Sequence, residues 1–225
     1  YGGAINLAGS VKGKKTAKHA VSDWMEIEKE RGISVTSSVM QFNYKDYCIN
    51  ILDTPGHQDF SEDTYRTLMA ADSAVMVIDA SKGVEAQTIK LFKVCVLRHI
   101  PIFTFINKLD REAQDPFDLM EDIESVLGIH TCPINWPIGS GKEFKGVYDR
   151  QTRHIHAFTE NNNGMKAASD RDLTMDSPEL EQELGSELYE RLVDDIELLD
   201  GASDELDMDL VSKGQLSPVP VPGSD

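Results

Sequence analysis

The stretch that organises this chain is YCINILDTPGH, residues 47–57. An apolar run of strand length is followed at once by an acidic residue, a Pro-Gly pair and a histidine, which is typical of a buried strand that ends in a sharp turn. In open α/β sheets, ligands bind beyond the carboxyl ends of the strands, where loop amides and helix N-termini favour negative charge. We therefore expect the Asp-x-x-Gly motif at residues 53–56 to lie at a phosphate site.

The side chains around this turn suit phosphate chemistry. The Asp53 carboxylate can hold Mg2+ through water, and the Gly56 amide can reach a terminal phosphate because no side chain blocks the approach. His57 can face that phosphate and orient an attacking water, although a loop histidine is also commonly just solvated. The Ser34 hydroxyl can complete the Mg2+ shell when a γ-phosphate is present, or it is simply a serine at a helix end.

A second motif lies downstream, where the apolar run at residues 101–106 ends in Asn107-Lys108-Leu109-Asp110. The Asp110 carboxylate can accept hydrogen bonds from guanine N1 and N2, whereas adenine offers no matching pair of donors. Asn107 can tie the loop to the base, and the Lys108 stem can lie along the ring. The two motifs in this order favour a guanine nucleotide; the alternative is two ordinary polar strand ends.

The other periodic segments alternate between strand and helix patterns. Lys45-Asp46 is expected to turn a strand at residues 35–43 back onto the organising strand. The next expected elements are helix 59–71, strand 74–78, helix 85–98, strand 101–106 and helix 117–128. This order predicts parallel crossovers and a doubly wound α/β core.

Composition and periodicity change near residues 131–138. A small hairpin is expected from residues 144–149 and 154–158, followed by an acidic helical segment at about 178–199. The tail at residues 216–223 contains too many prolines for a central strand.

The net charge and the cysteine content limit the partners and the compartment expected for this protein. The 225 residues carry a net charge of −17, of which −14 lies from Glu160 onward, with 18 acidic and 4 basic residues. Such a surface does not attract nucleic acid in general, so no DNA is expected as a partner and RNA contact would need local basic patches or proteins. The three cysteines have no CxxC spacing and two lie in apolar runs, which indicates buried free thiols of a reducing cytoplasm. The sequence shows no signal peptide and no apolar run of bilayer length, so no membrane partner is expected.

A phosphate-binding Gly-x-x-x-x-Gly-Lys-Ser/Thr motif is missing from the 225 residues. Two partial matches fail. The first, near residues 8–15, has Lys15 where the hydroxyl belongs, and in the second Gly141-Lys142 is followed by Glu143.

Together the motifs resemble a known family. The ordered set of residues 31–35 (RGISV), 53–57 (DTPGH) and 107–110 (NKLD) is similar to the G domain of translational GTPases. Within these the chain most resembles the bacterial class II peptide chain release factors, the release factor three family, rather than elongation factor G. The stretches that carry this distinction are residues 22–26, 38–42, 60–68, 104–108 and 136–139.

The resemblance implies a P-loop NTPase-like G domain with a mostly parallel sheet and an inserted α+β subdomain. It places the G domain at residues 1–135, an acidic insert at 136–215 and a truncated tail at 216–225. The family's first strand and P-loop would precede Tyr1, and its Ser-Ala loop would follow Val219. On this interpretation both ends of the nucleotide pocket are outside the chain.

The resemblance also implies a function and assigns roles to residues. It implies a cytoplasmic enzyme that uses GTP/GDP and Mg2+, docks at the large-subunit GTPase centre of the ribosome and ejects class I release factors. The GTP-binding positions are Asp53, Thr54, Pro55, Gly56, His57, Asn107, Lys108 and Asp110. His57 matches the catalytic position, Gly32 and Ser34 belong to switch I, and Ser34 with Asp53 would hold the metal. The alternatives are an elongation factor G-like translocase, a ribosomal protection GTPase, or a non-enzymatic interaction remnant.

Overall fold

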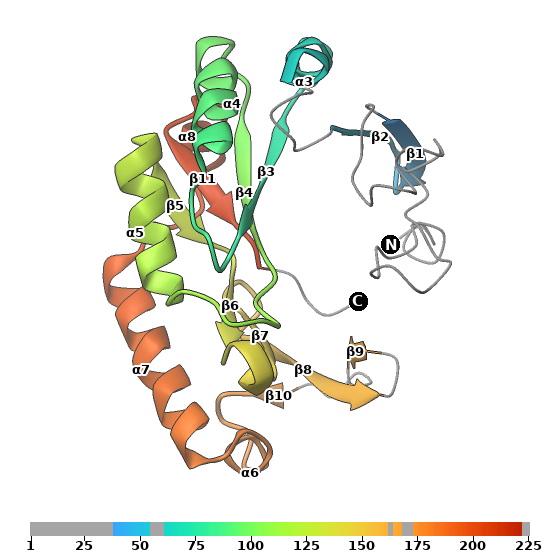
Figure 1. Ribbon diagram of the computed structural model, residues 1–225. Helices are drawn as coiled ribbons and strands as arrows, with labels where there is room; N and C mark the ends of the chain where they lie inside the picture. The colour runs from blue at the N-terminus through green and yellow to red at the C-terminus, as the bar shows by residue number, and fades with distance from the viewer. Residues whose placement is uncertain (1–37, 55–60, 162–163, 168–172, 222–225) are drawn as a thin grey trace. The chain divides into compact units, whose positions relative to one another are not determined.

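The computed structural model of the chain describes residues 38–54, 61–161, 164–167 and 173–221 (Figure 1). Residues 1–72 and 73–225 form two compact units, which are described separately. Five residues with expected roles, Gly32, Ser34, Pro55, Gly56 and His57, lie outside the described residues. Within the described ranges, no helix has both the length and the apolarity needed to cross a membrane.

The first unit contains the expected hairpin. Strands β1 (Ser38–Tyr44) and β2 (Tyr47–Asp53) pair antiparallel around the turn at Lys45-Asp46, and helix α3 (Ser61–Leu68) follows. The expectation that β2 is buried was wrong, since Tyr47 is 72% exposed and Ile51 44% exposed. Among the described strands β2 pairs with β1 alone, so its apolar residues have little cover.

The second unit begins with a parallel α/β layer, as the order of elements predicted. Strands β3 and β4 pair in parallel, β5 pairs in parallel with β11, and helices α4 and α5 lie along one side of these strands (Figure 1). Their bounds are β3 Ala74–Asp79, α4 Ala86–Leu97, β4 Ile102–Asn107, α5 Pro116–Leu127, β5 His130–Pro133 and β11 Leu216–Val219. Gly128 ends α5 in the left-handed conformation that favours glycine, with φ +70°.

The proline-rich tail forms a buried strand, so the prediction from its composition was wrong. The His130 amide donates to the Gln215 carbonyl and the Ile134 amide to the Val219 carbonyl, so the odd-numbered tail residues face β5. The even-numbered residues face β4, where the Ile106 amide donates to the Pro220 carbonyl at 3.3 Å. Because a residue's N–H and C=O point to the same side of a strand, Pro218 and Pro220 lack donors only on the β4 side, and pairing with β5 survives.

Two buried hydroxyls reinforce the β4 side of this strand. Thr104 and Ser217 are both 0% exposed, their hydroxyl oxygens are 2.8 Å apart, and the Ser217 hydroxyl donates to the Ile102 carbonyl at 3.0 Å. We expect Ser217→Ala to lower the free energy of unfolding by about 1–3 kcal/mol, because it leaves two buried polar groups without their partner. Thr104→Val should cost less, since Ser217 keeps its bond to Ile102.

Denaturant unfolding of both single variants and the double variant checks this prediction. The loss in the double variant should be smaller than the sum of the two single losses, because the hydroxyls share one bond. Strictly additive losses would show that the two side chains do not interact.

The elements that follow β5 in the chain build a second hydrophobic core. The antiparallel strands run in the order β10-β8-β7-β6, with β9 paired to β8. The strands are β6 Asn135–Ile138, β7 Gly146–Asp149, β8 His154–Asn161, β9 Gly164–Ala167 and β10 Leu173–Thr174, followed by helices α6 Leu180–Leu184, α7 Ser186–Ala202 and α8 Met208–Ser212. The hairpin of β7 and β8 confirms the prediction. The expected helical segment at about 178–199 is confirmed and consists of two helices, α6 and α7, because Gly185 between them has φ +85°.

The centre of this second core is Trp136. Its ring is 2% exposed and lies 4.5 Å from the ring of Phe117 on α5, measured between centroids. Its Nε1–H donates to the Asp195 carboxylate of α7 at 2.9 Å. Burial raises the pKa of Asp195, while the hydrogen bond from Trp136 and the charge of Arg191 act in the opposite direction. Placing the Asp195 carboxylate here thus costs desolvation of its charge, but it gives the buried Trp136 N–H a hydrogen-bond acceptor.

This arrangement gives a pH-dependent prediction for Asp195. A raised pKa means that the folded state binds the proton more tightly, so the wild type gains stability as pH falls through that pKa and loses it as pH rises. Asp195→Asn keeps an acceptor for the indole but does not titrate. The difference in free energy of unfolding between the variant and the wild type should therefore favour the variant at pH 7 and shrink towards pH 4.

Asp195→Leu is the matched comparison, because it removes the acceptor as well as the charge. It should cost about 1–3 kcal/mol at either pH, since the Trp136 N–H is left buried without a partner. Denaturant unfolding at pH 4 and pH 7 measures both variants. A difference between wild type and Asp195→Asn that does not vary with pH would contradict the assignment.

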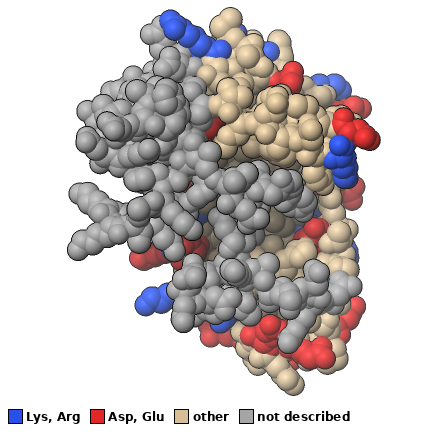
Figure 2. All heavy atoms as spheres, turned by 90° about the vertical axis from the view of Figure 1, so that its right-hand side faces the viewer, with Lys and Arg blue, Asp and Glu red and all other residues tan. Residues whose placement is uncertain are grey.

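The cysteines are free in the structure. Cys95 and Cys132 are buried, and burial raises the pKa of both thiols, whereas Cys48 on β2 is exposed. The acidity of the C-terminal third is visible in Figure 2, where acidic side chains gather at the lower end of the face drawn. Between residues 172 and 212 the sequence has a single basic residue, Arg191.

Candidate functional site

The carboxyl ends of β3 and β4 meet at one edge of the parallel layer. The two strands pair in register from Ala74 opposite Ile102 to Asp79 opposite Asn107. Alternate residues of β4 are buried against the core, with Ile102, Thr104 and Ile106 all at 3% exposure or less. The packing of these side chains fixes the register, and the register places the polar residues that follow each strand next to one another.

The loop Asn107–Asp110 is a tight turn held by its own bonds. The Asn107 side-chain oxygen accepts the Lys108 amide at 2.8 Å, and the Lys108 carbonyl accepts the Arg111 amide at 3.2 Å. Lys108 has φ +69°, an uncommon conformation for a residue with a side chain, which the surrounding bonds hold in place. Leu109 is 1% exposed, and its carbonyl accepts the Gly141 amide at 2.8 Å. The loop is therefore anchored in the protein at its centre.

Asp110 is exposed and lies beside a cavity. The cavity has a volume of about 590 Å3, and residues 110–113 and 140–143 line it. None of the described residues forms a hydrogen bond or an ion pair with the Asp110 carboxylate. Both carboxylate oxygens are therefore available to accept N–H groups of a ligand, as the sequence-based assignment requires.

Lys108 is held by a residue that the sequence analysis missed. Its Nζ forms an ion pair with Oδ2 of Asp79 at 2.5 Å, and Oδ1 of Asp79 accepts the Ser81 amide at 3.0 Å and the Ser81 hydroxyl at 2.6 Å. The hydrogen bond from Lys108, followed by that from Ser81, holds the pKa of Asp79 well below its usual range. The signal in the sequence was the acidic residue that ends the strand at residues 73–79, since parallel pairing brings it opposite Asn107.

The phosphate-side residues are only partly described. Asp53 and Thr54 are partly exposed at the end of β2, with Asp53 opposite Ser38. A carboxylate at a strand end is a hard oxygen donor that suits Mg2+, which usually keeps several waters. Asp53 and Asp110 belong to different units, so the expectation that they face one nucleotide stays a prediction. The described part of the chain contains no cluster of three or more His, Cys, Asp or Glu side chains that could hold a metal.

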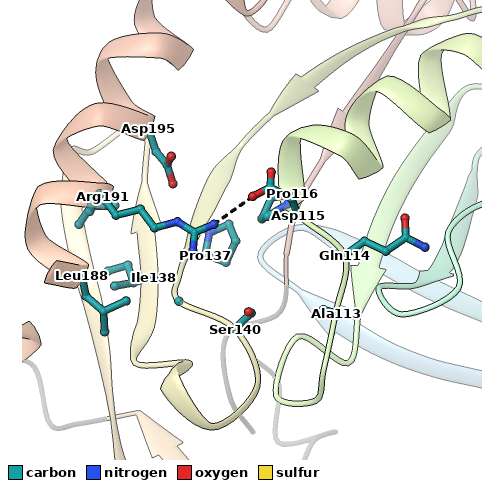
Figure 3. A pocket seen from close by; sticks show the side chains of 12 residues that line it. Ala113, Gln114, Asp115, Pro116, Pro137, Ile138, Ser140, Leu188, Arg191 and Asp195 are labelled. Carbon is teal, nitrogen blue, oxygen red and sulfur yellow. Dashed lines mark hydrogen bonds and ion pairs between the residues drawn. The ribbon is translucent and has the colours of Figure 1, made fainter.

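A second, smaller cavity lies next to the start of α5. It has a volume of about 210 Å3, and residues 113–116, residues 137–140 and the α7 side chains Leu188, Arg191, Leu192 and Asp195 line it. Figure 3 shows the Arg191 guanidinium reaching across to Asp115, with which it forms an ion pair at 2.9 Å. Asp115 also caps α5 by accepting the Phe117 amide. Since no residue of the Asn107–Asp110 loop lines this cavity, it is a joint between α5 and α7 rather than part of the candidate site.

Comparisons with known proteins agree with the motifs. The family model of the elongation factor Tu GTP binding domain matches residues 1–203. A protein of Symbiobacterium thermophilum named Peptide chain release factor 3 is 64% identical over 97% of this chain and 42% of its own length. Proteins with the same name from a Cyanothece species and from Microcystis aeruginosa are 56% and 55% identical, each over 97% of this chain and 40% of their own length. The chain thus spans about 40% of the length of these curated relatives.

A solved structure shows the same fold at low identity. The crystal structure of a Thermus thermophilus protein matches with a TM-score of 0.69 and 22% identity, over 98% of this chain and 34% of that protein. The parallel α/β layer, the Asn-Lys-x-Asp loop at its edge and the family match therefore agree, and the predicted resemblance to class II release factors is confirmed by the relatives. This chain belongs to the elongation factor Tu GTP binding domain family, the G domain of translational GTPases.

Proposed function

We propose that this protein is a ribosome-dependent GTPase that promotes the recycling of class I release factors at translation termination, in the cytoplasm. The observation that carries the proposal is the anchored loop Asn107–Asp110, which presents an exposed carboxylate beside a cavity. The finer role is supported by relatives of 54–64% identity that carry the name Peptide chain release factor 3. That name belongs to those relatives, and we propose that this protein has the same role.

Guanine recognition follows from the loop's chemistry. The Asp110 carboxylate would accept the N1–H and one N2–H of guanine, and these charge-assisted bonds are stronger than neutral ones. The Lys108 stem would lie along the base, while Asn107 keeps the loop closed through its bond to the Lys108 amide. Adenine would leave the carboxylate unpaired and would bind far more weakly.

On the phosphate side, we propose the roles that the motifs indicate. Asp53 and Ser34 would hold Mg2+, which when bound neutralises phosphate charge. Thr54, Pro55 and Gly56 would form the loop at the terminal phosphate, and Gly32 would belong with Ser34 to a switch that orders around it. His57 would orient the attacking water once the ribosome's large-subunit GTPase centre is engaged.

We also propose that residues 136–215 are an acidic subdomain inserted in the G domain of residues 1–135. The hydrophobic core around Trp136, Leu192 and Ile196 supports this division, because all of its fully buried members lie between residues 136 and 199, with Phe117 and Met120 of α5 packed against it. The strand at Leu216–Val219 would return the chain to the G domain, since it pairs with β5.

The test is a termination assay with the full-length protein. Ribosomes stalled at a stop codon carry a fluorescent class I release factor, and its dissociation is followed after peptide release with GTP or a non-hydrolysable analogue. We expect ribosomes to stimulate GTP hydrolysis and the protein with guanine nucleotide to accelerate dissociation of the release factor. Stimulated hydrolysis without any effect on the release factor, together with movement of tRNA and mRNA, would indicate a translocase instead.

A further inference from the structure

We propose that Asp79, oriented by Ser81, is a positioning residue that holds Lys108 in place for the guanine base before the nucleotide binds. The inference rests on the proposed guanine-binding function of the loop and adds a residue outside the Asn-Lys-x-Asp motif. It assigns a purpose to the loop that follows β3, to which the sequence motifs give none.

Both oxygens of the Asp79 carboxylate are used, and this fixes its orientation. Oδ1 accepts two bonds from Ser81, and Oδ2 is left for the ammonium group of Lys108. The Asp79 side chain is 13% exposed, whereas the Lys108 side chain is 43% exposed. The shielded and doubly bonded carboxylate is therefore the fixed partner, and the more exposed lysine takes its position from it.

The loop after β3 is attached to the guanine loop through its backbone as well. The Ala80 amide donates to the Asn107 carbonyl at 2.9 Å, and the Gln114 amide donates to the Ala80 carbonyl at 3.0 Å. The Gln114 side chain adds a bond to the Ser81 carbonyl at 3.2 Å. These contacts reach Asn107, which begins the Asn107–Asp110 loop, and Gln114, which follows it, so the two loops form one platform at the edge of the sheet.

A glycine and an aspartate close the far side of this platform. Gly83 has φ +69°, and its amide donates to the Asp79 carbonyl at 3.0 Å. A Cβ at this position would lie 2.8 Å from the Asp122 carboxylate, which itself accepts the Val84 amide at 2.9 Å. The loop is thus bent back tightly over Asp79, and α5 holds it there through Asp122.

The consequence for binding is preorganisation. A free lysine side chain loses rotamer entropy when a ligand orders it. A lysine already held by Asp79, on a backbone with its own fixed positive φ, loses less on binding. Because the low pKa of Asp79 keeps the carboxylate ionised, this effect should be the same from pH 6 to pH 8.

The experiment measures GDP affinity of the full-length protein by titration calorimetry, in the wild type and in a Lys108→Met background. Asp79→Asn removes the negative charge that holds Lys108 and replaces one carboxylate oxygen with an NH2 group. We therefore expect about 10-fold weaker GDP binding in the wild-type background. In the Lys108→Met background the same change should cost less than about twofold, since no lysine is left to position. Ser81→Ala keeps the charge and should weaken binding by an intermediate factor.

Glu121→Gln is the matched control, because it removes an exposed acidic charge from α5 without touching the platform. Its GDP affinity should equal that of the wild type. Equal losses from Asp79→Asn in both backgrounds, or no loss in either, would overturn the proposal. If Asp79→Asn does not fold, Ser81→Ala is compared in the wild-type and Lys108→Met backgrounds instead. A loss of GDP affinity in the first background alone would support the proposal, and equal losses or no loss would overturn it. If the wild type itself fails to bind GDP, the proposed function fails and this inference fails with it.

Discussion

Replacing Asp110 with asparagine is expected to weaken GDP binding by about 10²- to 10⁴-fold and to create binding of XDP. The carboxylate can accept from both N1–H and N2–H of guanine, whereas an amide presents one acceptor and one donor. Two hydrogen bonds to a charged group are each worth about 1.5–3 kcal/mol, which sets the size of the loss. Xanthine has an N1–H donor beside a carbonyl acceptor, and this pair matches the asparagine amide.

Competition between GDP and XDP on the full-length protein measures this exchange of preference. Asp118→Asn is the matched control, because it makes the same chemical change at an exposed position in the first turn of α5. The control should keep the wild-type preference for GDP. An Asp110→Asn variant that still prefers GDP would show that another group recognises the base edge.

Replacing His57 with alanine is expected to reduce ribosome-stimulated GTP hydrolysis by about 10²- to 10⁴-fold, the range for a group that positions or deprotonates an attacking water. GDP and GTP affinities should change less than about twofold, since the side chain acts on the water and not on the nucleotide. Single-turnover hydrolysis on ribosomes at saturating protein measures the chemical step, and titration calorimetry measures the affinity.

His156→Ala serves as the control for this variant, since His156 is an exposed histidine on β8 in the second core's sheet. It should hydrolyse GTP at the wild-type rate. Unchanged single-turnover hydrolysis in His57→Ala would refute a catalytic role. A parallel loss of nucleotide affinity would instead assign His57 to binding.

The position of the Asn107–Asp110 loop at the end of a strand could be predicted from sequence because its determinants are local. The apolar run at residues 101–106 predicts the strand, which the structure confirms as Ile102–Asn107, and the polar residues at its end predict that the chain leaves the sheet there. The partner of Lys108 could not be predicted in the same way. Asp79 lies 29 residues earlier in the chain, and the register of β3 against β4 alone brings the two side chains together.

The proline-rich tail shows where a composition rule fails. Proline is avoided in central strands because it has no N–H to donate to a neighbouring strand. In residues 216–221 the prolines fall on alternate positions, so all of the lost donors point towards β4 and none towards β5. The Thr104 and Ser217 hydroxyls bridge the weakened side. Such compensation depends on which strands become neighbours, and no local pattern contains that information.

The β1–β2 hairpin and the break between α6 and α7 show the same contrast between tertiary context and local sequence signals. The apolar run of β2 indicated burial, but burial depends on what packs against both faces of the strand, and the described part of the first unit supplies pairing on one edge. By contrast, the break between α6 and α7 had a local signal in Gly185, whose positive φ ends one helix before the next begins.

The most direct test of the account is a titration of the full-length protein with GDP, IDP and ADP. Inosine lacks only the 2-amino group of guanosine, so IDP removes one of the two donors that Asp110 is expected to bind, and ADP removes the pair. We predict that GDP binds about 10- to 100-fold more tightly than IDP, and that ADP binds at least about 10³-fold more weakly than GDP. Equal affinities for GDP and IDP would contradict recognition of the guanine edge by the Asp110 carboxylate.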